Sequence, residues 1–418
     1  MTEKQKARMQ MEQKKANKKK KWVKPRHRIV RNLAYLVLYP YSRIKYGIRI
    51  TKFKEQGDRN YLVLFNHQTA FDQFFVGMSF KGPIYYVASE DIFSMGWVSD
   101  ILRYVVAPIP IKKQTNDARA VINCARVAKE GGTIALAPEG NRTYSGVTEY
   151  IKPSIVNLIR FLRLPVVFYH IEGGYGVQPR WSDVKRKGIV RCGVFSVLEH
   201  EEYKTMTDDE LYARVCSELY VDEYTIEEQY VHKKSAEYLE RAMYVCPDCG
   251  LSEFESHDDI IACKSCGKQI RYRSDKKLEG VGCEFPFSTV TEWYRYQNGF
   301  VNGLDFTKTP DVLIYRDTVD LSEVILYHGK ELLREDAEWR LYGDRFVVDE
   351  GTSNELVLPF PELGVVTVLG KNKLNVYHGE HVYQIKGSKR MNALKYMNFY
   401  YRYKNVTEEV ENGQFLGL

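Results

Sequence analysis

The stretch Tyr61-Leu62-Val63-Leu64-Phe65-Asn66-His67-Gln68-Thr69-Ala70-Phe71-Asp72 decides the fold expected for this chain. Its first five residues are uniformly apolar, which is typical of a strand buried on both faces of a sheet. Similar apolar runs occur at 83–88, 105–109, 133–137 and 165–169. Segments with helical spacing of apolar residues lie between them, at 117–130 and 154–163. This alternation predicts an α/β domain in which helices cover a sheet.

The polar end of the same stretch pairs a histidine with an aspartate. Five residues on a continuous helix turn through about 140°, so His67 and Asp72 would not share one helix face. They meet if His67 lies in the turn after the strand and Asp72 lies in the first turn of the next helix. A carboxylate bonded to one imidazole nitrogen fixes the tautomer and makes the other nitrogen a better base. The pair is therefore a candidate general base and its orienting residue, although a spacing of this kind also arises by chance.

A second motif follows about 70 residues later: Ala137-Pro138-Glu139-Gly140-Asn141-Arg142-Thr143. Together the two motifs resemble the first and third blocks of the glycerol-3-phosphate and 1-acylglycerol-3-phosphate acyltransferase family. The usual forms of those blocks are Asn-His-x4-Asp and Phe-Pro-Glu-Gly-Thr-Arg-Ser, and their order also matches. The resemblance covers roughly residues 50 to 200, which is less than half of the chain.

The resemblance implies roles for individual residues. His67 would deprotonate an acceptor hydroxyl that attacks an acyl thioester, and Asp72 would orient and charge His67. Gly140 would allow the backbone to approach the thioester oxygen closely, as stabilisation of that oxygen requires. Glu139 and Arg142, with Arg142 as a bidentate partner for phosphate, would hold the acceptor.

Three further positions complete the expected substrate site. Asn66 belongs to the first block and is expected to contribute to substrate binding. The second block of the family, Gly-x-Ile-x-x-x-Arg, would fall at Ala107-Pro108-Ile109-Pro110-Ile111-Lys112-Lys113. Alanine replaces its glycine and lysine its arginine, so Lys113, or Lys112 beside it, is expected to contact phosphate without the two-pronged geometry of arginine.

Two Cys-x-x-Cys pairs lie outside this region. Cys246, Cys249, Cys263 and Cys266 have the spacing of a zinc ribbon, and a glycine follows each pair. Four thiolates leave no open position for a substrate, so a structural zinc ion is expected and no redox cofactor. A redox dithiol and an iron–sulfur cluster are the alternatives.

The charge of the chain is unevenly distributed. The net charge is +7 over 418 residues, yet residues 1–31 alone carry 13 Lys or Arg and only 2 Glu. The segment 33–46 is short, apolar and basic at both ends, so it is expected either to lie in a membrane interface or to pack as an ordinary amphipathic helix. No run reaches the ~18 apolar residues of a spanning helix. The cysteine pattern fits a reducing compartment, and no cleaved signal is expected.

These patterns predict an α/β acyltransferase domain followed by a helical arm, a zinc ribbon and a small, mostly β C-terminal domain, possibly of pleckstrin-homology type. The expected units are a disordered basic tail at 1–25, a membrane-interface segment at 26–50, the acyltransferase domain at 51–205, the arm at 206–244, the ribbon at 245–275 and the β-rich domain at 282–418.

The expected function is transfer of an acyl chain from acyl carrier protein or acyl-coenzyme A to a lysophospholipid acceptor, most simply 1-acylglycerol-3-phosphate. The expected place is the cytoplasmic face of the cell membrane, with peripheral or monotopic attachment to anionic lipids. Two alternatives dispense with turnover: a lipid sensor, and a nucleic-acid-binding protein that uses the tail and the ribbon. The second leaves both acyltransferase-like motifs unexplained, so nucleic acid is not expected as a partner.

Overall fold

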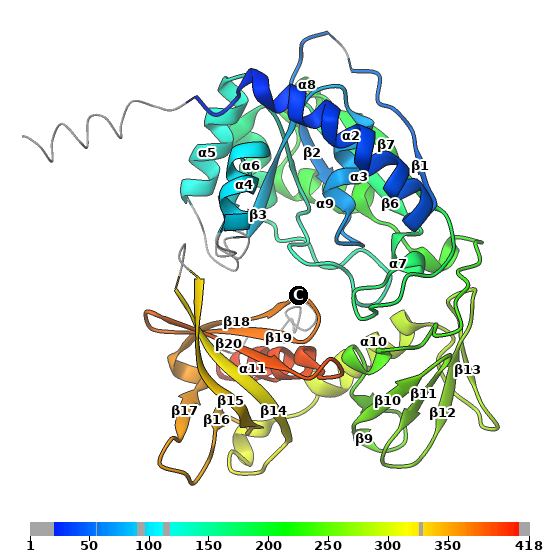
Figure 1. The fold of residues 1–418 in the computed structure, drawn as a ribbon, viewed down its shortest axis with the longest axis vertical. Coiled ribbons are helices and arrows are strands. Elements are labelled where there is room, and N and C mark those ends of the chain that lie inside the picture. Colours follow the sequence, from blue (N-terminus) through cyan, green and yellow to red (C-terminus); the bar gives the residue numbers. More distant parts are fainter. Residues whose placement is uncertain (1–20, 56, 90–96, 112–117, 326–328, 409–418) are drawn as a thin grey trace, which may run out of the picture.

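The computed structural model describes residues 21–55, 57–89, 97–111, 118–325 and 329–408. They form two lobes (Figure 1). The upper lobe is the N-terminal domain, residues 25–219. The lower lobe contains the cysteine unit, residues 245–280, and the C-terminal domain, residues 315–407.

A seven-stranded sheet with the order β1-β7-β6-β2-β5-β3-β4 forms the centre of the N-terminal domain. The strands are β1 (Ile48–Ile50), β2 (Leu62–Phe65), β3 (Ile84–Ser89), β4 (Ile109–Ile111), β5 (Thr133–Leu136), β6 (Val166–Glu172) and β7 (Val190–Leu198). Neighbouring strands run parallel except for β6 and β7, which are antiparallel. The sheet is therefore mixed.

Helices cover both faces of this sheet, as the apolar run at 61–65 predicted. Val63 and Phe65 of β2 belong to one apolar cluster with residues of α2 and α3, while Leu62 and Leu64 belong to a second cluster with α5, α6 and α9. Alternate residues of a strand point to opposite faces, so β2 is buried on both. The helices are α2 (Pro25–Tyr46), α3 (Asp72–Ser79), α4 (Trp97–Val105), α5 (Ala118–Lys129), α6 (Ile155–Leu162), α7 (Gly174–Val177), α8 (His200–Tyr203) and α9 (Asp208–Leu219).

One expected strand is misplaced. The apolar run at 105–109 is the end of α4, a turn in which Ala107 has φ +44°, and only then the start of β4 at Ile109. A short apolar run without alternation fits a buried helix end as well as a strand, which is why the pattern misled.

The expected helical arm at 206–244 contains a single α-helix. This helix, α9, lies against α6 and β6 of the N-terminal domain. The rest of the segment consists of extended chain, turns and two short 3-10 helices, η2 (Glu223–Thr225) and η3 (Leu239–Arg241). The segment is therefore less helical than its composition suggested.

The cysteine unit is a small β structure. A four-stranded antiparallel sheet has the order β10-β11-β12-β13, and a two-stranded ladder joins β8 to β9. The bounds are β8 (Val245–Cys246), β9 (Gly250–Leu251), β10 (Phe254–His257), β11 (Ile260–Cys263), β12 (Gln269–Tyr272) and β13 (Leu278–Gly280). The helix α10 (Val290–Asn302) leads from it to the C-terminal domain.

The C-terminal domain is an antiparallel sheet of seven strands, in the order β17-β16-β15-β14-β20-β19-β18, with the helix α11 (Ala393–Thr407) packed on β18 and β19. The strands are β14 (Tyr315–Ile325), β15 (Gly329–Leu341), β16 (Arg345–Val348), β17 (Leu356–Pro359), β18 (Leu363–Leu369), β19 (Lys373–His378) and β20 (His381–Gly387). Two 3-10 helices, η4 (Phe306–Lys308) and η5 (Phe360–Glu362), precede β14 and β18.

The two lobes share a core. Tyr144 and Trp181 of the N-terminal domain belong to the same apolar cluster as the interiors of the cysteine unit and the C-terminal domain. Arg241, only 2% exposed, joins the two lobes: its guanidinium donates to the carbonyl oxygens of Trp181 at 2.9 Å and Lys389 at 2.6 Å and to the Asp183 carboxylate at 2.8 Å. The lower lobe is thus packed onto the upper one rather than tethered to it.

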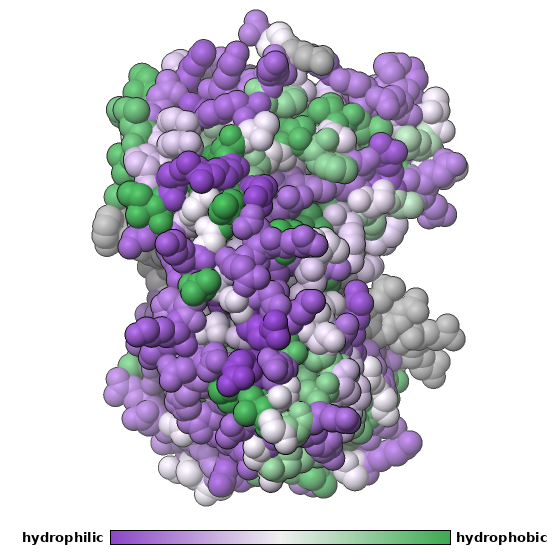
Figure 2. Space-filling model, turned by 90° about the vertical axis from the view of Figure 1, so that its right-hand side faces the viewer, coloured by the Kyte–Doolittle hydropathy of each residue, from purple (hydrophilic) through white to green (hydrophobic). Residues whose placement is uncertain are grey.

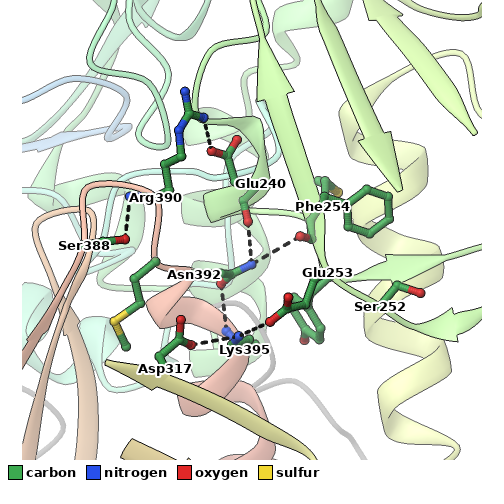
Figure 3. Close-up of a pocket in the computed structure, with 12 residues that line it drawn as sticks. Glu240, Ser252, Glu253, Phe254, Asp317, Ser388, Arg390, Asn392 and Lys395 are labelled. Atoms are coloured by element: carbon green, nitrogen blue, oxygen red, sulfur yellow. Dashed lines mark hydrogen bonds and ion pairs between the residues drawn. The ribbon is translucent and has the colours of Figure 1, made fainter. Parts of the chain in front are cut away.

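A small polar cavity of about 110 Å³ lies where the cysteine unit meets the C-terminal domain (Figure 3). Arg390 donates to Glu240 at 2.5 Å, and Asn392 donates to the carbonyl oxygen of the same residue at 2.9 Å. The ammonium group of Lys395 lies 3.0 Å from Asp317 and 3.8 Å from Glu253. Each cation that lines the cavity faces an acid, so we assign these groups to the interface.

Hydrophilic residues predominate on the face of both lobes seen in Figure 2, where hydrophobic residues form small separate groups. Within the part of the chain that the structure describes, no helix has both the length and the apolar character required to cross a membrane.

Candidate active site

His67 and Asp72 meet as the sequence predicted. The chain leaves β2 at Phe65 and enters α3 at Asp72, so His67 lies in the turn and Asp72 opens the helix. Their side chains are joined between Nδ1 and Oδ2 at 2.7 Å. The Asp72 carboxylate, 0% exposed, also accepts the N–H of Gln68 at 2.7 Å and the hydroxyl of Thr69 at 2.6 Å. These bonds fix the carboxylate so that one oxygen faces the imidazole.

The imidazole of His67 is poised to accept a proton. Burial lowers the pKa of His67 below 6.5, the Asp72 hydrogen bond and charge oppose this shift, and the nearby charges of Arg142 and Arg180 lower the pKa further. A neutral ring at pH 7 that donates from Nδ1 to Asp72 carries its lone pair on Nε2. No described side chain hydrogen-bonds to that Nε2.

Glu139 supports His67 through the backbone. One carboxylate oxygen accepts the His67 N–H at 2.7 Å, and the other accepts the N–H of Glu149 at 2.8 Å. Thr143 N–H in turn donates to the His67 carbonyl at 2.9 Å. Two residues of the second motif, Glu139 and Thr143, therefore hold the turn that carries the histidine through hydrogen bonds to its backbone. Each carboxylate oxygen of Glu139 thus accepts one backbone N–H, and its expected contact with the acceptor stays a prediction.

Asn66 is also used within the fold. It is 2% exposed, and its amide both donates to and accepts from the backbone of Ile171 at 2.8 Å. It therefore ties the end of β2 to β6, and its expected contribution to substrate binding stays a prediction. Gly140 has φ +71°, a conformation that favours glycine, and its own N–H donates to Ala137 at 3.0 Å. The glycine makes the turn but is not itself a free N–H donor.

Two arginines lie beside the histidine. Arg142, the expected phosphate contact, has its pKa lowered to about 10 by burial and then by the charge of Arg180. Arg180 is 3% exposed; it donates to the carbonyl oxygen of Arg142 at 3.1 Å and stacks on the Tyr144 ring at 4.3 Å. Neither guanidinium forms an ion pair with a carboxylate of the described residues.

A large cavity of about 1120 Å³ opens beside His67. Residues from α2, α3, β3 and α6 give it a mainly hydrophobic lining, as in Val30, Leu38, Phe74, Met78, Val87 and Leu158. The polar side chains on its wall include His67, Glu139, Arg31, Gln73 and Lys152. His67 therefore lies at the cavity, whose apolar lining suits a hydrocarbon chain, and close to Arg142 and Arg180, whose charges suit an anion.

Lys112 and Lys113 fall outside the described residues. Sequence reasoning also missed two contributors to the site. Arg180 belongs to no motif, and Glu149, which accepts from the hydroxyls of Thr143 and Ser145 at 3.0 Å each, lies beyond the motif that it braces. No local pattern would have found Arg180, because its neighbours come from distant parts of the chain.

The four cysteines of the two pairs converge. Their sulfur atoms all lie within 4.8 Å of one another, and the sulfurs of Cys246 and Cys266 are 3.8 Å apart. Sulfurs that surround one tetrahedral ion at about 2.3 Å are separated by about 3.8 Å, so the cluster has dimensions that suit a metal ion. The glycines after the pairs, Gly250 and Gly267, both have positive φ, +73° and +74°, as tight turns around the sulfurs require.

Comparison with known proteins places the site in a family. Residues 44–171 match the family model described as Acyltransferase. No curated protein matches the chain. Among solved structures, the 1-acyl-sn-glycerophosphate acyltransferase PlsC from Thermotoga maritima is 20% identical, with 46% of this chain and 75% of that chain covered and a TM-score of 0.38.

The N-terminal PH domain of the human ARAP2 protein is 10% identical, with 23% of this chain and 84% of that chain covered and a TM-score of 0.20. Both TM-scores are too low for the likeness to establish a fold. The family match stands on its own, and it spans His67, Asp72, Glu139 and Arg142. Residues 44–171 therefore belong to the acyltransferase family.

Proposed function

We propose that the protein transfers an acyl chain from an acyl thioester, carried by acyl carrier protein or coenzyme A, to the free hydroxyl of 1-acylglycerol-3-phosphate or a similar lysophospholipid, which makes phosphatidic acid. The observation that carries this proposal is the position of His67, whose Asp72-bonded ring lines an apolar cavity of about 1120 Å³ and lies within the field of two arginines.

The proposed reaction uses His67 twice. Nε2 accepts the proton of the acceptor hydroxyl as its oxygen attacks the thioester carbonyl carbon, which gives a tetrahedral oxyanion. When that intermediate collapses, the new ester C–O bond is retained and the C–S bond breaks. The departing thiolate takes the proton from His67, so the ring ends neutral and ready for another cycle. Asp72 stabilises the imidazolium between the two transfers.

The substrates fit the site by chemical class. The hydrophobic wall accommodates an acyl chain, while Arg142 offers two parallel N–H donors to a phosphate. A lysophospholipid carries an acyl chain and a phosphate in one molecule, and its free hydroxyl lies between these two groups.

We also propose that α2 attaches the enzyme to an anionic membrane surface on the cytoplasmic face, as a peripheral or monotopic protein. One face of α2 lines the cavity through Val30, Ala34 and Leu38. The neighbouring face exposes Ile29, Leu33, Leu36, Val37 and Ile44, each at least 60% exposed. Such a helix can lie in the headgroup region, where substrate chains reach the cavity directly. Residues 1–20 of the basic tail predicted at 1–25 lie outside the described residues.

For the cysteine cluster we propose structural zinc. Cysteine thiolates are preferred zinc ligands, and four of them close the coordination sphere, so the ion would bind no substrate. It would hold together the turns that join the short strands of the cysteine unit, since metal binding of this kind is coupled to folding.

The decisive experiment is an acyl-transfer assay on liposomes that contain 1-acylglycerol-3-phosphate and an acyl thioester. We expect turnover by the wild type and a loss of at least about 10²-fold in His67→Ala. His200→Ala is the matched control, because His200 lies on α8 with its ring packed on Tyr203, away from the site. Full turnover by His67→Ala would remove His67 as the base. Binding of lysolipids without turnover of any would favour a lipid sensor.

A further inference from the structure

The C-terminal domain reaches the catalytic region through one hairpin. The turn between β18 and β19 meets the loop that follows α7, and Figure 1 shows these two strands on the side of the lower lobe that faces the upper one. Val368 accepts a hydrogen bond from Arg180 at 3.3 Å through its carbonyl oxygen. Lys371 donates to the carbonyl oxygen of Ser182 and to the Asp183 carboxylate, both at 2.5 Å.

Among the residues that the structure describes, Arg180 has no negatively charged partner. Its two terminal nitrogens donate to the carbonyl oxygens of Arg142 and Val368 at 3.1 and 3.3 Å, near or beyond the long end of the usual range. Its Nε is buried without a hydrogen-bond partner. A charged group this deeply buried is costly unless an opposite charge approaches it.

The nearby acids are committed elsewhere. Asp72 is bonded to His67, and Asp183 is bonded to Arg241 and Lys371. Arg142 and Arg180 therefore remain two adjacent positive charges, and repulsion between them adds to the cost of burial. Both costs fall when an anion binds.

We infer that Arg180 is a second anion-binding residue, which takes the phosphate of the acceptor together with Arg142, and that the β18–β19 hairpin of the C-terminal domain holds it in position. This inference rests on the proposed acyl transfer and specifies how that site selects its acceptor. A phosphate offers several oxygens to two guanidinium groups, and the long bonds of Arg180 to carbonyl oxygens are the ones it would exchange. Lys371 is a positioning residue, because it anchors the hairpin to the loop that carries Arg180.

The test compares acceptors with and without the phosphate. Wild type, Arg180→Gln and Arg180→Lys are assayed with 1-acylglycerol-3-phosphate and with uncharged monoacylglycerol. Glutamine can still donate to the two carbonyl oxygens but carries no charge, whereas lysine keeps the charge. For Arg180→Gln we expect KM for the phosphate acceptor to rise at least about tenfold with little change for monoacylglycerol, and Arg180→Lys to retain part of the preference.

Arg186→Gln is the matched control. Arg186 lies in the same loop, is 1% exposed, stacks on Trp181 and donates to a carbonyl oxygen. Its charge is not among the main causes of the pKa shifts of His67 and Arg142. We expect this variant to lose stability and to change activity with both acceptors equally. Lys371→Met should weaken the phosphate preference a few-fold, and Lys371→Arg should restore it.

A second arm identifies the source of the phosphate. The donor is varied between acyl-coenzyme A and an acyl thioester of N-acetylcysteamine, which carries no phosphate. If the effect of Arg180→Gln disappears with the second donor, Arg180 binds the donor and the inference is overturned. Equal losses with both acceptors would also overturn it. If the wild type acylates neither acceptor, the proposed function itself fails, and competition for binding of glycerol 3-phosphate then tests the anion site alone.

Discussion

The carboxylate of Glu139 accepts the backbone N–H of His67 at 2.7 Å, so the single acidic residue of the second motif supports the histidine of the first. Because its other oxygen accepts the N–H of Glu149, each oxygen of Glu139 accepts one backbone donor. This geometry gives Glu139 a role in holding the turn that carries His67.

Substitution of Glu139 by Gln should therefore destabilise the turn that carries His67 and leave the affinity for the acceptor nearly unchanged. A glutamine presents one oxygen and one NH₂ group, so one of the two buried N–H donors loses its acceptor. We expect the free energy of unfolding to fall by about 1–3 kcal/mol. We also expect kcat to fall more than tenfold while KM for the acceptor stays within about twofold. Denaturant unfolding and steady-state kinetics measure these effects, and a rise of KM alone would indicate a substrate contact instead.

The pH dependence of kcat/KM should report His67. Because burial and the two arginines lower the pKa of His67 from 6.5, activity should rise with pH through a midpoint below 6.5 and level off near neutrality. Arg180→Gln removes a charge that lowers this pKa, so its midpoint should move to higher pH. Asp72→Asn removes a charge that raises it; the midpoint should move lower, and kcat should fall by about 10² to 10⁴. If the midpoint is unchanged in both variants, the rise of kcat/KM with pH belongs to a group other than His67.

The cysteine cluster should hold one zinc ion per chain. Metal analysis of purified protein measures this directly, and Cys246→Ser should lower the zinc content and the Tm because binding is coupled to folding. Cys283→Ser is the control, since Cys283 is an exposed cysteine outside the cluster. Iron with acid-labile sulfide would instead identify an iron–sulfur cluster.

The exposed face of α2 should govern membrane binding. Leu36 and Val37 are each 69% exposed, and their joint replacement by Glu should weaken sedimentation with anionic vesicles at least tenfold through lost burial and added repulsion. Val312→Glu, at a 57% exposed position in the loop before the C-terminal domain, is the control. Vesicle binding that survives the double replacement would place the docking surface elsewhere.

The sequence predicted what local chemistry determines. The apolar run before His67 placed β2, and the five-residue spacing placed Asp72 in the first turn of α3, where its bond to Nδ1 is confirmed. The local sequence could not show whether the Glu139 carboxylate contacts a ligand or a backbone N–H, because either can supply the hydrogen-bond donors that a buried carboxylate needs. Arg180 was beyond reach because its contact with Val368 spans 188 positions of the chain. The pleckstrin-homology character of the C-terminal domain stays a prediction.

Tyr144 and Trp181 of the N-terminal domain belong to a core that the lower lobe completes, and this affects how the protein folds during synthesis. The loop just after Arg142 packs against α10, where Thr291 donates to the carbonyl oxygen of Ser145 at 2.9 Å. During synthesis those partners emerge from the ribosome well after the N-terminal domain, which must meanwhile expose part of its interior. We expect the nascent chain to acquire activity only once α10 and the strands behind it have been translated, so that premature termination yields an inert product.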